Sequence, residues 1–114
     1  MLYTAQYRYS GEDRFDITVR GNTQTGKLYA PTWSMVNGIR NKTLSYEDYT
    51  AQYYNLLLKR WITHSTVISN LVDKIQTEDV TFVCFCPAGS FCHRYLLVNF
   101  LQYNWDIEYG GERK

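Results

Sequence analysis

The sequence predicts a single small α/β domain in which helices cover a mixed or mainly parallel sheet. Its 114 residues fit one domain over residues 1–114, and a chain of this size buries roughly two-thirds of the surface of its unfolded state. The predicted elements follow the order strands, helices, strand, helix and strand. The run VTFVCFC at residues 80–86 is apolar and β-branched, as is typical of a strand buried on both faces of a parallel sheet.

Two segments near the amino terminus have the composition of strands. Residues 2–9 are rich in tyrosine and threonine, and residues 15–19 read FDITV. The turn-forming residues 10–13 lie between them, so the two segments form either a hairpin or two successive strands. Residues 20–26, RGNTQTG, contain no apolar anchor and are predicted to be an exposed loop.

Three helices are predicted in the middle of the chain. The first starts after Pro31-Thr32 and ends near residues 38–41. The second starts at Ser45 in a capping-box pattern and runs to Trp61 with an aromatic face. The third covers residues 65–76, where apolar side chains form one stripe: Val67, Ile68, Leu71, Val72 and Ile75.

The last third of the chain is predicted to contain a strand, a turn, a helix and a second strand. Residues 87–90 form the turn after the apolar strand, and residues 92–103 form a mostly apolar helix. The segment WDIEY at 105–109 alternates large apolar and acidic residues, which predicts a short final strand. Residues 110–114 are predicted to be a polar tail.

The composition excludes several classes of protein. Twelve Lys and Arg against eleven Asp and Glu leave a net charge of +1, too little for a broad basic nucleic-acid-binding face. A hydrophobic fraction of 45% with 17% aromatic residues excludes intrinsic disorder. The sequence contains neither an apolar signal core in its first residues nor a run of about 18 apolar residues, so we expect neither export nor a membrane span.

Three cysteines within nine positions indicate a reducing compartment. They are Cys84, Cys86 and Cys92, an odd number that fits no secreted disulfide framework. We therefore expect the protein in the cytoplasm. The oligomeric state stays open.

The segment CPAGSFCHR at residues 86–94 is where chemistry is expected. In open α/β sheets, ligands collect at the carboxyl ends of strands, where loops lead into helix amino termini that attract anions. Gly89 permits a tight turn and Ser90 can cap the helix. The side chains of the first helical turn are then a thiol, an imidazole and a guanidinium: Cys92, His93 and Arg94. This grouping predicts an anion or nucleotide pocket at the strand, loop and helix of residues 80–103.

Other chemistries fit the spacing less well. A cysteine-dependent phosphatase needs an arginine two positions earlier than Arg94, and a thiol-disulfide oxidoreductase needs cysteines two residues apart rather than the five that separate Cys86 and Cys92. Zinc would have four ligands of suitable type in Cys84, Cys86, Cys92 and His93. However, neighbouring residues on a helix point about 100° apart, and Cys84 is expected to face the core. We therefore expect no metal site and no cofactor.

Four stretches of the sequence carry a resemblance to a known family. They are DIT at 16–18, APTW at 30–33, LSYEDYTAQY at 44–53 and VTFVCFCPAGSFCHRYLL at 80–97. Together they resemble the small DUF488 proteins of bacteria and phages. The resemblance implies a compact α/β domain in an intracellular setting, which is the host cytoplasm if a phage encodes the protein. It implies no assigned activity.

The resemblance also marks individual positions. Cys86, Cys92, His93 and Arg94 are similar to the family's Cys-x5-Cys-His-Arg signature, and Asp16 to the acid that follows an early strand. Pro31 and Trp33 match a Pro-x-Trp element, and Tyr49 and Tyr53 match recurrent aromatics. Family members occur among genes concerned with nucleic acid, which by association favours a nucleotide or nucleic-acid ligand.

Two functions are consistent with these observations. The first is a thiol-dependent enzyme that acts on a nucleotide or nucleic acid, with Cys86, Cys92 and His93 as catalytic residues. The alternative is a non-catalytic module that binds a small anion, a nucleotide, nucleic acid or a protein. In both, the ligand is expected to be bound by residues around the same segment: Arg94, Ser90, Gly89, Asp16 and Trp33. Arg94 is also expected to meet an anion, which is either Asp16 or the ligand, because a cation is unfavourable at a helix start.

Overall fold

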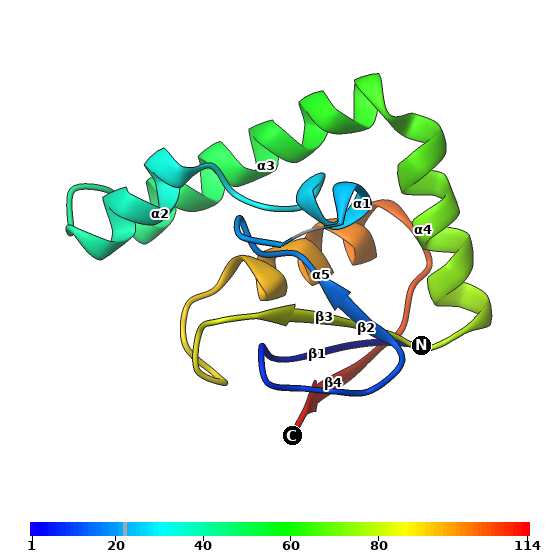
Figure 1. The fold of residues 1–114 in the computed structure, drawn as a ribbon. Coiled ribbons are helices and arrows are strands. Elements are labelled where there is room, and N and C mark those ends of the chain that lie inside the picture. The colour runs from blue at the N-terminus through cyan, green and yellow to red at the C-terminus, as the bar shows by residue number, and fades with distance from the viewer. Residues whose placement is uncertain (22) are drawn as a thin grey trace.

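The computed structural model describes residues 1–21 and 23–114. In this part of the chain, four parallel strands form one sheet in the order β2-β3-β1-β4 (Figure 1). The strands are β1 (Leu2–Gln6), β2 (Arg14–Asp16), β3 (Val80–Cys84) and β4 (Tyr109–Arg113). The helices are α1 (Gln24–Lys27), α2 (Trp33–Arg40), α3 (Tyr46–Thr63), α4 (Ser65–Thr77) and α5 (His93–Asn104). The chain is an α/β domain with an all-parallel sheet, as predicted.

Strand β3 lies inside the sheet, between β2 and β1, and every one of its residues is buried. The prediction of a strand buried on both faces is therefore confirmed, although the strand ends at Cys84 rather than at Cys86. Phe85 beyond it is exposed and Cys86 is half-buried. Because β1, β2 and β3 are parallel, their carboxyl ends meet at one edge of the sheet, where ligand sites form in this class of fold.

The first two strands do not form a hairpin. β3 lies between them, pairing Val83 with both Ala5 of β1 and Asp16 of β2. A buried apolar strand needs a partner on each side for its backbone groups, and β1 and β2 supply them. The sequence allowed either a hairpin or two successive strands, and the structure contains the two successive strands.

Local sequence signals place the helix starts correctly. The Thr32 side chain accepts a hydrogen bond from the Met35 N–H at the start of α2, and Ser45 accepts one from the Asp48 N–H at the start of α3. Each such cap contributes about 1 kcal/mol. In α4, four of the five residues of the predicted stripe are buried: Ile68, Leu71, Val72 and Ile75.

The helices form layers on the sheet. In Figure 1, α5 lies against the sheet, where it contacts β1 and β3, and α3 runs above α5. The core lies between these layers and includes Tyr53 of α3, whose hydroxyl donates a hydrogen bond to the Tyr29 carbonyl at 2.7 Å. Among the described residues, no helix combines the length and apolar character that crossing a membrane requires.

Two segments differ from the prediction. The final strand covers Tyr109–Arg113 rather than residues 105–109, because the polar tail pairs its backbone with the edge of β1. The apolar or polar character of the side chains is a weak guide to where an edge strand forms, because such a strand needs backbone hydrogen bonds to only one neighbouring strand. Part of the predicted loop 20–26 folds as the single turn α1, while Asn22 lies outside the described residues.

A candidate cysteine–histidine site

The turn from β3 to α5 brings the predicted site residues to the carboxyl edge of the sheet. Gly89 has a φ of +79°, which a residue without a side chain adopts freely. The Ser90 hydroxyl donates a hydrogen bond to the Pro87 carbonyl at 2.7 Å, and the Gly89 N–H donates one to the Tyr95 hydroxyl at 3.0 Å. Both Gly89 and Ser90 are exposed and shape the turn, and neither lines the pocket described below.

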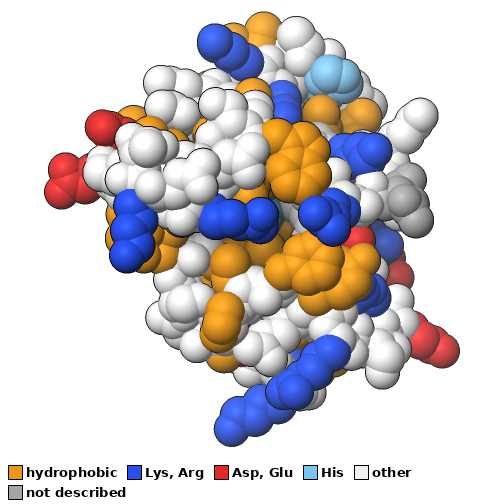
Figure 2. All heavy atoms as spheres, turned by 60° about the vertical axis from the view of Figure 1, so that its left-hand side comes forward, with side chains coloured by type: hydrophobic (Ala, Val, Ile, Leu, Met, Phe, Trp, Pro, Cys, Tyr) orange, Lys and Arg blue, Asp and Glu red, His pale blue; other side chains and the backbone are white. Residues whose placement is uncertain are grey.

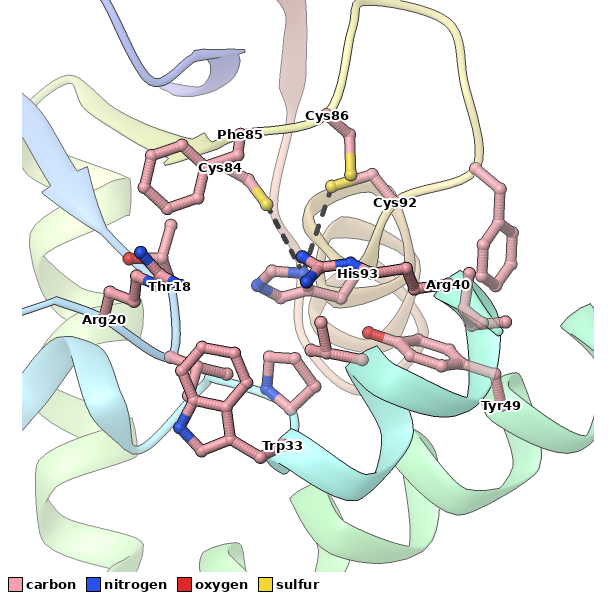
Figure 3. A pocket seen from close by; sticks show the side chains of 15 residues that line it. Thr18, Arg20, Trp33, Arg40, Tyr49, Cys84, Phe85, Cys86, Cys92 and His93 are labelled. Atoms are coloured by element: carbon pink, nitrogen blue, oxygen red, sulfur yellow. Dashed lines mark hydrogen bonds between the residues drawn. The ribbon is translucent and has the colours of Figure 1, made fainter. Parts of the chain in front are cut away.

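Two buried cysteines and one buried histidine converge where β3 ends and α5 begins. The Nδ1 atom of His93 lies 3.6 Å from Cys84 Sγ and 3.9 Å from Cys92 Sγ (Figure 3). The other ring nitrogen, Nε2, lies 2.8 Å from the carbonyl oxygen of Ile17, which follows β2. All three side chains of this Cys84–Cys92–His93 cluster are at least 95% buried. Cys84 therefore faces the cluster rather than serving only as a filler of the core.

The expected divergence of Cys92 and His93 is wrong. Cys92 is not in the first helical turn but is the N-cap of α5, with φ −157° and ψ 144°. The 100° rotation between neighbours applies only when both residues are helical. An extended N-cap turns its side chain back over the helix start, and both Cys92 and His93 therefore reach Cys84.

The third cysteine is next to the cluster but more accessible. Cys86 is half-buried, and Figure 3 shows its sulfur beside that of Cys92. Hydrogen bonds from Cys84 and Cys92 lower the pKa of Cys86, and raise the pKa of both donors in turn. Burial lowers the pKa of His93 to about 4, so its imidazole is neutral at neutral pH.

Arg94 is bound within the protein and not by Asp16. Its guanidinium is fully buried and pairs with Glu112 of β4, with Nη2 2.7 Å from Oε2 and Nε 3.3 Å from Oε1. Nη1 donates to the Cys86 carbonyl at 3.0 Å and to Cys92 Sγ at 3.3 Å. The anion that was expected to meet Arg94 at the helix start is thus Glu112. This residue belongs to the segment that was predicted to be a polar tail.

Asp16 has a different position from the one expected. Its carboxylate accepts hydrogen bonds from the Thr18 N–H at 2.9 Å, the Thr18 hydroxyl at 2.7 Å and the Tyr7 hydroxyl at 3.2 Å. These bonds hold the turn after β2, and the same turn presents the Ile17 carbonyl to His93. Asp16 therefore holds the turn that carries the Ile17 carbonyl, and its carboxylate bonds to Thr18 and Tyr7.

A pocket of about 190 Å³ opens above the cluster. Cys84, Cys86, Cys92 and His93 lie at its base, and Trp33 is the one other predicted site residue that lines it. The remaining lining is mostly apolar and aromatic, with two arginines: Thr18, Val19, Arg20, Pro31, Val36, Ile39, Arg40, Tyr49, Phe85 and Phe91. Figure 2 shows hydrophobic side chains gathered on this side of the molecule, with Lys and Arg side chains among them.

Sequence reasoning missed Arg20, Arg40 and Phe91 as pocket residues. Trp33 and Arg40 are seven residues apart on α2 and therefore on one helical face, so the spacing did contain a signal for Arg40. Arg20 has no such signal, because only the fold brings its guanidinium to 5.4 Å from the centre of the Trp33 ring. The ring of Phe91 packs against two tyrosine rings of α3: its centre lies 4.1 Å from that of Tyr46 and 5.2 Å from that of Tyr49.

Comparison with known proteins identifies a family. The family model DUF488-N3a, described as the active DUF488-N3 subclade, matches residues 8–105 and so covers most of the chain. No curated protein and no solved structure matches. The family match contains both the turn after β2 and the whole β3-to-α5 segment that build the cluster. The chain therefore belongs to the DUF488 family.

Proposed function

We propose that this protein is an enzyme that binds a nucleotide-class ligand in the aromatic pocket and acts on it with the thiols at the pocket base. One observation carries the proposal: three cysteines and a histidine lie under a pocket with aromatic walls and two arginines. The description of the matched family as an active subclade also favours an enzyme over a passive module. Free thiols persist in a reducing compartment, so we expect this enzyme in the cytoplasm.

The pocket walls suit a planar ring. Trp33 is 45% exposed, and Phe91 and Tyr49 also line the pocket, so a base can stack as nucleobases do on aromatic side chains. A volume of about 190 Å³ is below the roughly 300–1,000 Å³ of pockets for larger ligands. It has room for one ring, while the sugar and phosphate would remain at the surface beside Arg20 and Arg40.

Cys86 is the thiol best placed to meet the ligand. It lines the pocket and is half-buried, whereas Cys84 and Cys92 are buried beneath it. As a thiolate, Cys86 can add to an electrophilic ring carbon of the ligand: the S–C bond forms as a C=C bond of the ring opens, and the ring takes up a proton in place of the one that the thiol released. This makes Cys86 the candidate nucleophile. Cys92 and His93, which belong to the cluster next to Cys86, are the candidate assisting residues.

One observation favours the alternative of a non-catalytic binding module. Among the described residues, no carboxylate lines the pocket, and Arg94 is engaged by Glu112. General acid–base chemistry would therefore depend on the thiols and His93 alone. The two following experiments separate ligand binding from thiol reactivity.

We expect nucleoside monophosphates to stabilise the protein against heat and inorganic phosphate to have little effect. A ligand at 100 times its dissociation constant adds about 2.7 kcal/mol. Trp33→Ala should weaken this binding at least about fivefold, because loss of a stacking ring costs about 1–3 kcal/mol. Thermal melts with a panel of nucleoside monophosphates and a single-stranded DNA oligonucleotide measure this. Tyr103→Ala, at an exposed tyrosine outside the pocket, is the control. Binding that is unchanged in Trp33→Ala would contradict the proposed ligand position.

We expect Cys86 to react with iodoacetamide before Cys84 and Cys92, because it is the most accessible of the three thiols. Peptide mass spectrometry on chelator-treated protein, sampled over time at neutral pH, gives each rate. A bound nucleotide should slow the labelling of Cys86, and Cys86→Ser should remove the fast phase. Slow labelling of all three cysteines at similar rates would instead support a binding module.

A further inference from the structure

The ligand atoms of the Cys84–Cys92–His93 cluster lie close enough together to hold a metal ion after small side-chain movements. The two sulfur atoms and a ring nitrogen of His93 all lie within 4.8 Å of one another. They come from two elements that tertiary structure brings together, the end of β3 and the start of α5. Thiolate and imidazole are the ligand types that zinc prefers in proteins.

The two nitrogen–sulfur separations are close to those of tetrahedral zinc. Zinc lies about 2.3 Å from sulfur and about 2.0–2.1 Å from nitrogen, which places tetrahedral sulfur and nitrogen ligands about 3.5 Å apart. His93 Nδ1 lies 3.6 Å from Cys84 Sγ and 3.9 Å from Cys92 Sγ. The two sulfur atoms lie within 4.8 Å of each other, whereas two thiolates on one tetrahedral zinc lie about 3.8 Å apart. An ion therefore fits between these atoms if the two cysteine side chains close by up to about 1 Å.

The orientation of His93 is also that of a metal ligand. Its Nε2 lies 2.8 Å from the Ile17 carbonyl oxygen, and because a carbonyl only accepts, this nitrogen carries the hydrogen. Nδ1 is then left with its lone pair directed at both Cys84 and Cys92. A backbone carbonyl on the second nitrogen is the usual support of a metal-bound histidine. The imidazole is only 5% exposed, so water does not offer this lone pair an alternative partner.

We propose that Cys84, Cys92 and His93 bind one zinc ion, with the fourth coordination position directed to Cys86 and the pocket. Cys86 is half-buried and its sulfur lies beside that of Cys92, but it is not one of the three residues whose ligand atoms lie within 4.8 Å of one another, so it borders the open side of the cluster without being a ligand (Figure 3). Three protein ligands with one exchangeable position distinguish catalytic zinc sites from closed structural ones. The catalytic part of this inference rests on the proposed function, whereas zinc binding does not.

Zinc is not needed to hold the domain together. The core contains buried side chains from the sheet and from α2 to α5, and it does not depend on the cluster. The metal-free protein should therefore stay folded, and it can be studied in the same buffers as the zinc-loaded protein.

Metal content of protein purified without chelators tests the proposal directly. We expect about one zinc per chain by mass spectrometry of the metals, and recovery of that ratio when chelator-treated protein is reloaded with zinc. Cobalt in place of zinc should give the intense visible bands of a tetrahedral site together with sulfur-to-cobalt charge-transfer bands. This cobalt spectrum needs no variant, so it remains informative if a substitution prevents folding.

Variants identify the ligands. Cys84→Ser, Cys92→Ser and His93→Ala should each weaken zinc binding by about tenfold or more, while Cys86→Ser should retain close to one zinc per chain. His64→Ala, at an exposed histidine, is the matched control and should bind zinc like the wild type. Circular dichroism verifies that each variant is folded.

Two results would overturn the proposal. A wild-type chain that stays without zinc after reloading excludes the site, and loss of zinc from Cys86→Ser excludes the open fourth position. Nucleotide binding is measured in parallel on the metal-free protein. Nucleotide binding without zinc binding would refute only this inference, and zinc binding without nucleotide binding would refute only the proposed function.

Discussion

Replacing Arg94 with leucine is expected to lower the free energy of unfolding by about 3 to 5 kcal/mol, the effect of breaking a buried ion pair from one side. The guanidinium is fully buried, and the carboxylate of Glu112 is 21% exposed. Leucine would remove both hydrogen bonds to Glu112 and leave the Cys86 carbonyl without its donor. A partly buried carboxylate without a partner accounts for most of the loss.

Urea denaturation at neutral pH measures this difference. Arg8→Leu is the control, because Arg8 is exposed and its substitution should change stability by less than about 0.5 kcal/mol. In the double variant Arg94→Leu, Glu112→Leu the loss should be smaller than the sum of the two single losses. An Arg94→Leu protein as stable as the wild type would show that Arg94 awaits a ligand rather than stabilising the fold.

The Arg94 effect should also depend on pH. Burial acts to raise the pKa of Glu112, but the hydrogen bond and charge of Arg94 outweigh it and hold the pKa below its ordinary value of 4.5. Glu112 therefore contributes stability above that value, and the contribution is lost as the pH falls through its lowered pKa. The stability difference between the wild type and Arg94→Leu should accordingly shrink in acid.

Replacing Phe82 with alanine should cost about 3 to 5 kcal/mol, as is usual for a large buried aromatic side chain. Phe82 lies in the middle of β3 with no exposed surface, and its ring centre is 5.7 Å from that of Phe15 in β2. The cavity would open two residues before Cys84. The position of β3 sets the position of Cys84, so zinc binding and nucleotide binding should weaken together with stability.

Phe85→Ala is the matched control for Phe82→Ala. Phe85 is 57% exposed and stacks on Tyr7 with ring centres 4.1 Å apart, so its truncation should cost no more than about 1.5 kcal/mol. Urea denaturation of the two variants gives their midpoints, and these are converted to free energies of unfolding with one common dependence on urea concentration. Equal losses at the two positions would mean that β3 is not the buried centre of the sheet.

Features that depend on neighbouring residues could be predicted from the sequence. Thr32 and Ser45 cap their helices through backbone N–H groups three residues away, so the helix starts were visible in the local pattern. The buried strand β3 was visible because only a strand covered on both sides tolerates an uninterrupted apolar run. The grouping of Cys86, Cys92 and His93 followed from their place after this strand.

Features that depend on distant residues could not be predicted in this way. Glu112 reaches Arg94 only because the last residues of the chain pair with the edge of β1, and nothing in the polar sequence of 109–113 indicates a strand. Whether the Cys92 and His93 side chains converge depends on where α5 begins. The helix was predicted to begin at Cys92, but it begins at His93. With Cys92 in the extended N-cap position, the two side chains converge instead of diverging.

By itself, the sequence determined the α/β class, the starts of α2, α3 and α4, and the chemical content of the site: three thiols, one imidazole and an aromatic residue. These follow from apolar periodicity and from hydrogen bonds between near neighbours, which act over a few residues. The tertiary structure alone decided which groups meet. It paired Arg94 with Glu112 rather than with Asp16, directed His93 Nδ1 at two thiols through the Ile17 carbonyl, and brought Arg20 to the pocket. Side chains far apart in sequence become neighbours only through the order and register of the strands, which the packing of the whole sheet sets.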